Sequence, residues 1–241
     1  GEVRSGDQIL DKPGNKVDES LPLQIKNRAC PYVSWGGMKL AGALDEFTLS
    51  VTGRHCLDVG ASTGGFTQVL LLRGAASVTA LDVAYGFLDQ QLRSDSRVRV
   101  LERTNIRVLP DDYFREPFDL ITADVSFISL RHIINKVAAF LAVNGHFLAL
   151  IKPQFEAERH EVEPGGLVTD PQIHEAVIRR LQAAFHPHDL YLHGLHDIRR
   201  ASARKNREFL SWWQRNPSGL SHEDILTRLR RIDPQAPDQQ Q

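Results

Sequence analysis

Cysteine is scarce in this chain. Among 241 residues there are two cysteines, Cys30 and Cys56, which excludes the disulfide framework of small secreted proteins. Cys56 lies inside a strand-like apolar run, and this setting favours a buried thiol over a reactive one. These observations predict a reducing, cytoplasmic compartment.

Long hydrophobic runs are also missing. A membrane-spanning helix needs about 20 consecutive apolar residues, whereas the longest candidates here are as short as Val137–Val143. The first ten residues, GEVRSGDQIL, are polar and include acids, so we expect no signal peptide. The sequence therefore predicts a protein without a membrane span.

The sequence also lacks histidines at the spacing of a metal-ligand set. Four histidines lie close together in the sequence, but their spacing is not that of a ligand set, so we expect surface histidines. They are His186, His188, His193 and His196.

Charge of one sign is missing as well. The formal net charge is −1, with 41% hydrophobic and 24% charged residues, which is ordinary for a soluble globular protein. The exception is Arg199–Arg215, where six cationic residues accompany one acid, Glu208. Such a cluster can contact RNA phosphates, although a solvated basic loop is the simpler interpretation.

Strand-like and helical segments alternate through most of the chain, which predicts an α/β fold with a mostly parallel sheet covered on both faces. The link Arg199–Lys205 is too short for a crossover helix, so we expect the last strand to be antiparallel. The predicted strands are Arg54–Gly60, Ser77–Val83, Arg97–Glu102, Phe118–Asp124, His146–Lys152, Tyr191–Ile198 and Asn206–Trp213. The predicted helices are Gly65–Gly74, Leu130–Leu141, a helix from the N-cap Asp170 to Phe185, and Ser221–Ile232.

The two ends of the chain differ from this pattern. Residues 1–26 contain short strand-like pieces broken by glycine and proline, and we expect them to form a separate segment. The central domain then spans residues 27–232. Residues 233–241, DPQAPDQQQ, are polar and rich in proline and glutamine, which predicts a disordered tail.

A glycine-containing loop, LDVGASTGGF, joins the first predicted strand of the sheet to the first helix. Glycines at such a turn let the backbone approach a ligand closely. Asp82 follows 22 residues after Gly60, where an acid can accept hydrogen bonds from ribose hydroxyls. The spacing differs from G-x-G-x-x-G and suits a nucleoside without a pyrophosphate, such as S-adenosylmethionine. A nicotinamide dinucleotide is the alternative ligand.

Charged residues stand at the ends of several predicted strands. In an open parallel sheet, ligands bind outside the carboxyl ends of the strands. Asp124 and Lys152 end two strands that we expect to be neighbours, and Glu208 lies near the start of the reversed last strand, at the same edge. Lys39 precedes the first strand of the sheet. The sequence therefore predicts a charged crevice beside the glycine loop.

With these motifs in view, the chain resembles the TlyA (hemolysin A) family of FtsJ-like RNA ribose 2′-O-methyltransferases. The resemblance covers roughly Tyr32 to Trp213, with the blocks in the family's order. These blocks read VSWGGMKL, CLDVGASTGGFT, LERTNIR, ADVSFISL, LIKPQFE, GGLVTDPQIH and KNREFL. Residues 1–25 resemble the last part of an S4 RNA-binding domain whose first helices are missing, so we expect a truncated copy.

This resemblance implies a Rossmann-like class I methyltransferase fold, with a seven-stranded sheet preceded by a partial S4-like segment. It implies S-adenosyl-L-methionine as cofactor and ribosomal RNA or a ribosomal subunit as partner, with cytidine as the target. The implied catalytic tetrad is Lys39, Asp124, Lys152 and Glu208. The implied cofactor-binding residues are Asp58, Gly60, Ser62, Gly64, Gly65, Phe66, Asp82, Thr104, Asn105 and Asp124. The expected substrate-binding residues are Ser34, Phe127, Arg199, Arg200, Arg204 and Lys205.

The chain departs from the family pattern at two places. Trp35 stands where the family usually has an arginine, within the block that contains Ser34. The approach to the last block, RRASARKN, is more basic than the family's glycine-rich sequence. Both departures affect positions where the family contacts cofactor or RNA.

The chemistry expected of this set begins at a ribose 2′-hydroxyl, which must lose its proton to become a nucleophile. Lys152, when neutral, is the expected general base. Asp124 and Glu208 are expected to orient it, while Lys39 places the ribose or phosphate. Phe127 is expected either to line the target pocket or simply to pack.

Three other functions remain open from the sequence. The family's older name suggests a membrane-active cytolysin, which would require an amphipathic or long apolar segment. A non-catalytic RNA-binding protein could keep the same fold. A DNA or small-molecule methyltransferase is the third alternative, but DNA base methylation normally uses a different motif where this chain reads ADVSFISL.

Overall fold

The computed structural model describes residues 3–5, 8–9, 17–18, 20–25, 30–198 and 206–231. The chain divides into two compact units, Gly1–Pro31 and Tyr32–Gln241. In the first unit, β1 (Val3–Ser5) pairs antiparallel with both β2 (Gln8–Ile9) and β3 (Gln24–Ile25). The expected disordered tail lies outside the described residues, and so does part of the expected S4-like segment.

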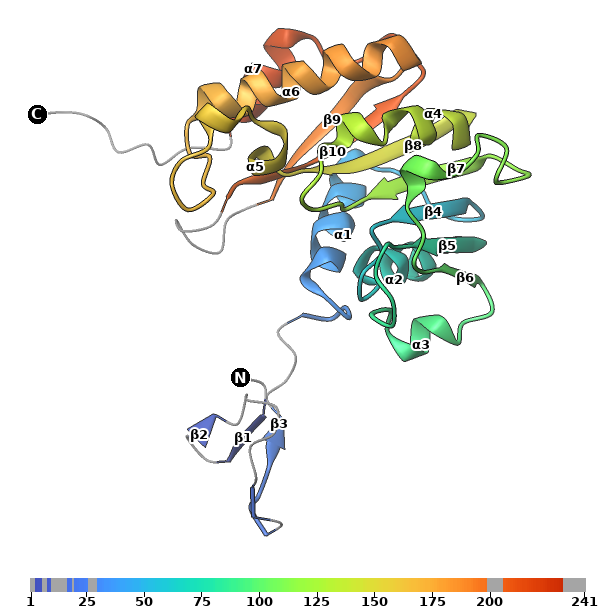
Figure 1. The fold of residues 1–241 in the computed structure, drawn as a ribbon, viewed down its shortest axis with the longest axis vertical. Helices are drawn as coiled ribbons and strands as arrows, with labels where there is room; N and C mark the ends of the chain where they lie inside the picture. The colour runs from blue at the N-terminus through green and yellow to red at the C-terminus, as the bar shows by residue number, and fades with distance from the viewer. Residues whose placement is uncertain are drawn as a thin grey trace, which may run out of the picture. The chain divides into compact units, whose positions relative to one another are not determined.

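The second unit contains a seven-stranded sheet in the order β6-β5-β4-β7-β8-β10-β9 (Figure 1). Strands β6, β5, β4, β7 and β8 are parallel, and β10 is antiparallel to both of its neighbours. This confirms the predicted sheet with one reversed strand. The strands are β4 (His55–Val59), β5 (Ser77–Leu81), β6 (Val98–Leu101), β7 (Phe118–Ala123), β8 (Leu141–Ile151), β9 (Tyr191–Ile198) and β10 (Glu208–Gln214).

Helices cover both faces of this sheet, as the alternating pattern predicts (Figure 1). One hydrophobic core lies under α1 (Trp35–Phe47), α2 (Gly65–Leu72) and α3 (Gln90–Arg93). The other lies under α4 (Ile134–Phe140), α6 (Pro171–Phe185) and α7 (His222–Arg231). Shorter helices connect these elements: η1 (Ile106–Val108), η2 (Leu130–His132), α5 (Pro153–Glu156), η3 (Arg159–Glu161) and η4 (His186–His188).

The continuous apolar run of β8 follows from its position inside the sheet. Phe147 and Ile151 belong to one core, whereas Leu148 and Leu150 belong to the other. Because side chains alternate between the faces of a strand, a strand covered on both sides needs apolar residues at every position. Its apolar character therefore reports burial, and Lys152, the residue directly after the strand, marks the end of the covered region.

Two predicted elements differ from the structure. The strand expected at His146–Lys152 begins earlier, at Leu141, because this residue pairs with Phe118 of β7 across a shift in register. The helix expected over Leu130–Leu141 is therefore shorter and is preceded by η2, whose N-cap is Ser129. Both differences arise from pairing with a distant strand, which local periodicity does not report.

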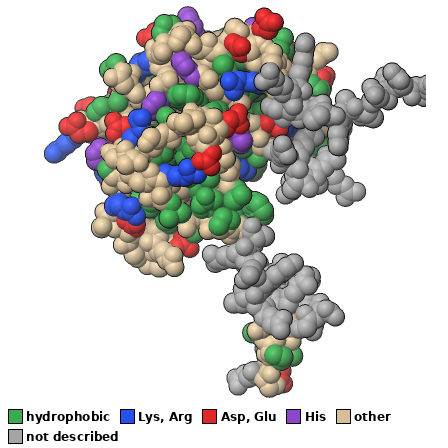
Figure 2. All heavy atoms as spheres, turned by 180° about the vertical axis from the view of Figure 1, so that it is seen from behind, with side chains coloured by type: hydrophobic (Ala, Val, Ile, Leu, Met, Phe, Trp, Pro, Cys, Tyr) green, Lys and Arg blue, Asp and Glu red, His purple; other side chains and the backbone are tan. Residues whose placement is uncertain are grey.

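The surface of the second unit carries mixed charge. Figure 2 shows cationic, acidic and histidine side chains interspersed over one face, in keeping with the net charge of −1. In the described part of the chain, no helix has both the length and the apolar composition that crossing a membrane requires.

Candidate active site

The predicted charged residues meet at the carboxyl edge of the sheet. Asp124 directly follows β7, and Lys152 directly follows β8. Glu208 is the first residue of β10, which runs antiparallel to β8 with Phe209 paired to Ile151. Continuing this register by one residue places Glu208 opposite Lys152, so the reversed direction of β10 brings an acid to the lysine.

The four residues form two ion pairs. The Lys152 Nζ lies 2.6 Å from Asp124 Oδ1 and donates a hydrogen bond to Ser126 Oγ at 2.8 Å. The Lys39 Nζ lies 2.5 Å from Glu208 Oε2. Lys39 comes from α1, so the helix preceding the first strand of the sheet reaches the same edge. All four side chains are partly screened from solvent, and Lys152 is the most enclosed, at 12% exposed.

The surroundings of Lys152 suit a proton acceptor. A neutral lysine amine has two N–H donors and one lone pair. If the two donors are directed to Asp124 and Ser126, the lone pair remains available to a substrate hydroxyl. The arrangement can therefore orient the nitrogen and receive a proton.

A cavity of about 480 Å³ adjoins Asp124. This size lies within the range of roughly 300–1,000 Å³ that is usual for small-molecule sites. Seven of the predicted site residues line it: Gly60, Ser62, Asp82, Thr104, Asn105, Asp124 and Phe127. The remaining lining residues are Val59, Leu81, Val83, Ile106, Arg107, Val125, Ser126, Ile128 and Ile133.

The glycine turn at the cavity requires Gly60. Its φ is +81°, and a Cβ there would lie 2.5 Å from the carbonyl oxygen of Asp124. Any side chain would therefore clash with the backbone that carries the acid, in a conformation that L residues rarely adopt. The absence of a side chain lets the end of β4 approach the end of β7.

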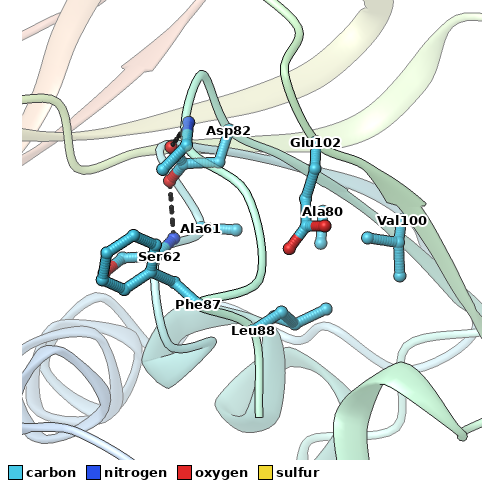
Figure 3. Close-up of a pocket in the computed structure, with 9 residues that line it drawn as sticks. Ala61, Ser62, Ala80, Asp82, Phe87, Leu88, Val100 and Glu102 are labelled. Atoms are coloured by element: carbon cyan, nitrogen blue, oxygen red, sulfur yellow. Dashed lines mark hydrogen bonds between the residues drawn. The ribbon is translucent and has the colours of Figure 1, made fainter. Parts of the chain in front are cut away.

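Asp82 is held in place by backbone amides (Figure 3). One carboxylate oxygen accepts from Ser62 N at 2.7 Å, and the other accepts from Ala84 N at 2.8 Å. Each oxygen keeps a second lone pair, so ribose hydroxyls can still donate to this group. Glu102, directly after β6, lines together with Asp82 a further hollow of only about 10 Å³, which is too small for a ligand.

Four residues expected to bind the cofactor do not line the cavity: Asp58, Gly64, Gly65 and Phe66. Asp58 is fully buried, and its carboxylate accepts hydrogen bonds from the hydroxyls of Thr67 and Thr122, at 2.7 and 2.9 Å. Burial raises the pKa of Asp58 to about 6. Its carboxylate therefore joins β4 to α2 and to β7 through the two threonines.

Phe127 stands at the rim of the cavity and is 90% exposed. Its ring centroid lies 5.2 Å from that of Phe155. A second hollow of about 390 Å³ adjoins this pair, and its other lining residues include Arg107, Arg131 and His132. An exposed ring beside cationic side chains favours the substrate role over packing.

The remaining expected substrate contacts are placed differently. Ser34 is the half-buried N-cap of α1, one turn before Lys39. Trp35 is 63% exposed and lies four residues before Lys39, on the same side of the helix. The basic residues Arg199, Arg200, Arg204 and Lys205 lie outside the described residues.

Sequence reasoning missed Ser126 and most of the apolar lining. Ser126 lies two residues after Asp124, and Ile106 follows Asn105, inside blocks that the sequence had already singled out. Their positions inside these two sequence blocks, next to predicted site residues, could therefore have been used to predict them. Among the residues that the structure describes, no three histidine, cysteine or acidic side chains form a group that could hold a metal ion.

The lining residues fit S-adenosyl-L-methionine. Asp82 offers a carboxylate to ribose hydroxyls, and apolar side chains such as Val83 and Ile106 can cover the faces of an adenine. Asp124 places a negative charge on the cavity wall next to Lys152, and this charge would favour a cationic sulfonium.

Comparison with known proteins supports the same assignment. The family model of FtsJ-like methyltransferases matches residues 32–215. A candidate rRNA methyltransferase of Bacillus subtilis, YqxC, is 46% identical over 75% of this chain and 65% of its own length. The 16S/23S rRNA (cytidine-2′-O)-methyltransferase TlyA of Mycobacterium tuberculosis is 46% identical over 76% of this chain and 70% of its own. The chain thus spans about two thirds of the length of these curated relatives.

Solved structures agree at the level of the fold. A candidate hemolysin from Streptococcus thermophilus superposes with a TM-score of 0.79 at 36% identity, covering 96% of this chain and 87% of that one. The structural superposition and the sequence match over residues 32–215 lead to one conclusion. The chain belongs to the FtsJ-like methyltransferase family.

Proposed function

We propose that this chain transfers a methyl group from S-adenosyl-L-methionine to a ribose 2′-hydroxyl of ribosomal RNA. The observation that carries the proposal is the position of Lys152, fixed by Asp124 and Ser126 at the edge of the cavity. The Mycobacterium tuberculosis relative, named for cytidine 2′-O-methylation, supports cytidine as the target.

The reaction requires a deprotonated oxygen in line with the methyl group. When bound, S-adenosyl-L-methionine would supply an electrophilic methyl carbon, whose bond to sulfur breaks as the ribose oxygen bonds to it, with S-adenosyl-L-homocysteine as the leaving group. Lys152 accepts the proton of the 2′-hydroxyl through its lone pair, while Asp124 and Ser126 keep the nitrogen oriented. The resulting ammonium is stabilised by Asp124 until the proton passes to water. Much of the rate comes from this alignment.

Lys39 and Glu208 complete the tetrad. Glu208 lies opposite Lys152 in the strand register and pairs with Lys39, so the second ion pair borders the first. Lys39 retains donors that can contact the ribose or its phosphate. We therefore assign placement of the substrate to Lys39 and orientation of the Lys39 side chain to Glu208.

The proposed function also assigns roles to the other parts of the chain. Residues 27–232 are assigned to the methyltransferase domain, and residues 1–26 to an S4-like RNA-binding segment. Phe127, Ser34 and the basic residues between β9 and β10 contact the RNA. Because ribosomal RNA is the substrate, the protein acts in the cytoplasm.

Methyl transfer to ribosomal subunits tests this function. The protein is incubated with labelled S-adenosyl-L-methionine and with 30S subunits, 50S subunits or naked rRNA from cells that lack the modification. We expect label in RNA, at the 2′-oxygen of a cytidine, mapped by ribose-methylation sequencing. RNA binding without label in any of these substrates would instead identify a non-catalytic RNA-binding protein.

A second candidate is membrane lysis, because a similar solved structure is described as a candidate hemolysin. Leakage from dye-loaded liposomes of phosphatidylcholine and phosphatidylglycerol, without cofactor, measures it directly. Leakage that Lys152→Ala leaves intact would assign lysis to a different part of the molecule from the methyltransferase site.

A further inference from the structure

The carboxylate of Glu156 is buried beside the site, and the reaction does not use it. The residue is 3% exposed and ends the short helix α5. Its Oε2 accepts from Ser129 Oγ at 2.5 Å, and its Oε1 accepts from the backbone N–H of Leu130 at 2.7 Å. Burial raises the pKa of Glu156. Burying a carboxylate costs free energy unless hydrogen bonds compensate it, as these two bonds do.

These bonds join two loops that both carry tetrad residues. Helix α5 places Glu156 one turn after Lys152. Residues 124–130, which follow β7, are therefore tied to this helix at two points. At one end Lys152 contacts Asp124 and Ser126, and at the other Glu156 holds Ser129 and Leu130.

Phe127 lies between these two points of attachment. Its φ is +63°, in the left-handed region that non-glycine residues seldom adopt. Such a conformation is strained and persists only when neighbouring contacts enforce it. The ring is 90% exposed, so burial of the side chain does not supply that enforcement.

We propose that Glu156 is a positioning residue that holds Phe127 in this conformation at the rim of the cavity. The bonds to Ser129 and Leu130 fix the loop after Phe127, just as the Lys152 contacts fix the loop before it. The ring is then presented beside Phe155, between the two cavities that Phe127 lines, where it can contact the target nucleotide. The inference rests on the proposed function and adds a residue that acts through Phe127.

A purely structural role predicts a different outcome. Glu156 also caps the 3-10 helix η2, so its loss could destabilise the fold without any link to Phe127. The two roles separate in a double-mutant cycle. If Glu156 acts through Phe127, its removal has little further effect once the Phe127 ring is gone.

The cycle comprises Glu156→Ala, Phe127→Ala and the double variant, measured by kcat/KM for methyl transfer to ribosomal subunits. We expect Glu156→Ala to lower kcat/KM roughly 10- to 100-fold, as misplacement of a substrate contact does. The dissociation constant for S-adenosyl-L-methionine should change less than about threefold. In the Phe127→Ala background, Glu156→Ala should lower the rate less than about twofold further.

Two further variants sharpen the result. In Glu156→Gln the amide oxygen can still accept from Leu130 N–H, but the amide nitrogen cannot replace the acceptor of the Ser129 hydroxyl, because that oxygen already accepts from Arg131 N and Nε, so we expect only part of the rate to return. Glu161→Ala is the matched control, because this neighbouring acid binds Arg180 and lines neither of the two site cavities. Its rate should remain at the wild-type value. Should Glu156→Ala fail to fold, Ser129→Ala removes half of the contact and takes its place in the cycle.

Additive losses in the cycle, or a wild-type rate for Glu156→Ala, would overturn the inference while leaving the proposed function intact. Absence of methyl transfer by the wild-type protein would overturn the proposed function alone. In that case the same cycle is measured as the dissociation constant for the ribosomal subunits. Non-additivity there supports the role of Glu156, and additivity excludes it.

Discussion

At the scale of single residues, the site depends on which hydrogen-bond partners each charged group finds. Lys152 is identifiable in the sequence as the first polar residue after an apolar strand. Its contact with Ser126 is not, because a serine two positions beyond Asp124 has no distinguishing pattern. Asp58 shows the reverse case. Its place in the glycine loop predicts a ligand contact, but the residue is fully buried and its carboxylate accepts from two threonine hydroxyls.

Replacing Lys152 with alanine tests the general base. We expect the single-turnover rate of methyl transfer to fall about 10²- to 10⁴-fold, because a positioned base contributes that much. The dissociation constant for S-adenosyl-L-methionine should stay within about threefold. The control is Lys136→Ala, which removes a lysine of α4 that pairs with Asp111. A loss of cofactor affinity with an unchanged single-turnover rate would refute the assignment.

Asp58 should make stability depend on pH. Its pKa is raised from 3.8 to about 6, so the native state holds the proton more tightly than the unfolded state. The stabilising contribution is therefore complete below the unfolded value and is lost as the pH rises through about 6. Relative to wild type, Asp58→Asn should gain on the order of 2–3 kcal/mol of unfolding free energy between about pH 4 and pH 7. Urea titrations across this range measure it, and parallel pH curves would contradict it.

Trp35 should report RNA binding by its fluorescence. It is 63% exposed, whereas Trp213 is buried and Trp212 is partly covered and bonded to His146. Iodide should therefore quench mainly Trp35 in the free protein, and ribosomal RNA should protect it. Trp35→Ala should weaken RNA binding about tenfold, as loss of one stacking contact does. Binding of RNA that leaves iodide quenching unchanged would place Trp35 outside the interface.

At the scale of secondary structure, alternating pattern and turn residues predict which elements exist. The helix capped by Asp170 and the strand Tyr191–Ile198 are found with the expected bounds. The boundaries fail where a strand is extended by a distant partner, as at Leu141 paired with Phe118. Local sequence carries no information about such pairing, because the partner lies more than twenty residues away.

The start of β10 should depend on a buried ion pair. Arg207 precedes Glu208, and its Nε lies 2.7 Å from Asp197, with both side chains less than 10% exposed. Asp197→Ala leaves an uncompensated buried charge, so we expect a loss of about 3–5 kcal/mol in unfolding free energy. The matched control is Asp45→Ala, which breaks an exposed pair with Arg73 and should cost less than about 1 kcal/mol. Equal urea midpoints for the two variants would contradict this expectation.

At the scale of the whole molecule, the sheet order creates the site. Placing β10 between β8 and β9 reverses one strand and delivers Glu208 to the edge where the parallel strands end. Helix α1 brings Lys39 to the same edge from the start of the unit. The ion pair of Lys39 with Glu208 therefore joins segments 169 residues apart.

Cofactor binding should stabilise the second unit as a whole. A ligand that binds only the native state adds about 2.7 kcal/mol when its concentration is 100 times its dissociation constant. We therefore expect S-adenosyl-L-methionine to raise the melting temperature measured by scanning fluorimetry. Asp82→Ala should remove most of the shift, whereas Asp111→Ala, a surface acid away from the cavity, should retain it. A shift that survives Asp82→Ala would exclude the ribose contact.

The sequence by itself determined the α/β alternation, the reversed last strand, the glycine turn and the four charged residues of the site. These features are local, because periodicity, turn residues and strand ends are set by neighbours along the chain. Only the tertiary structure decided that Lys39 pairs with Glu208, that Asp58 is buried, and that Glu156 braces the loop of Phe127. These outcomes depend on which distant groups meet in the folded core, where burial and hydrogen-bond partners are fixed together.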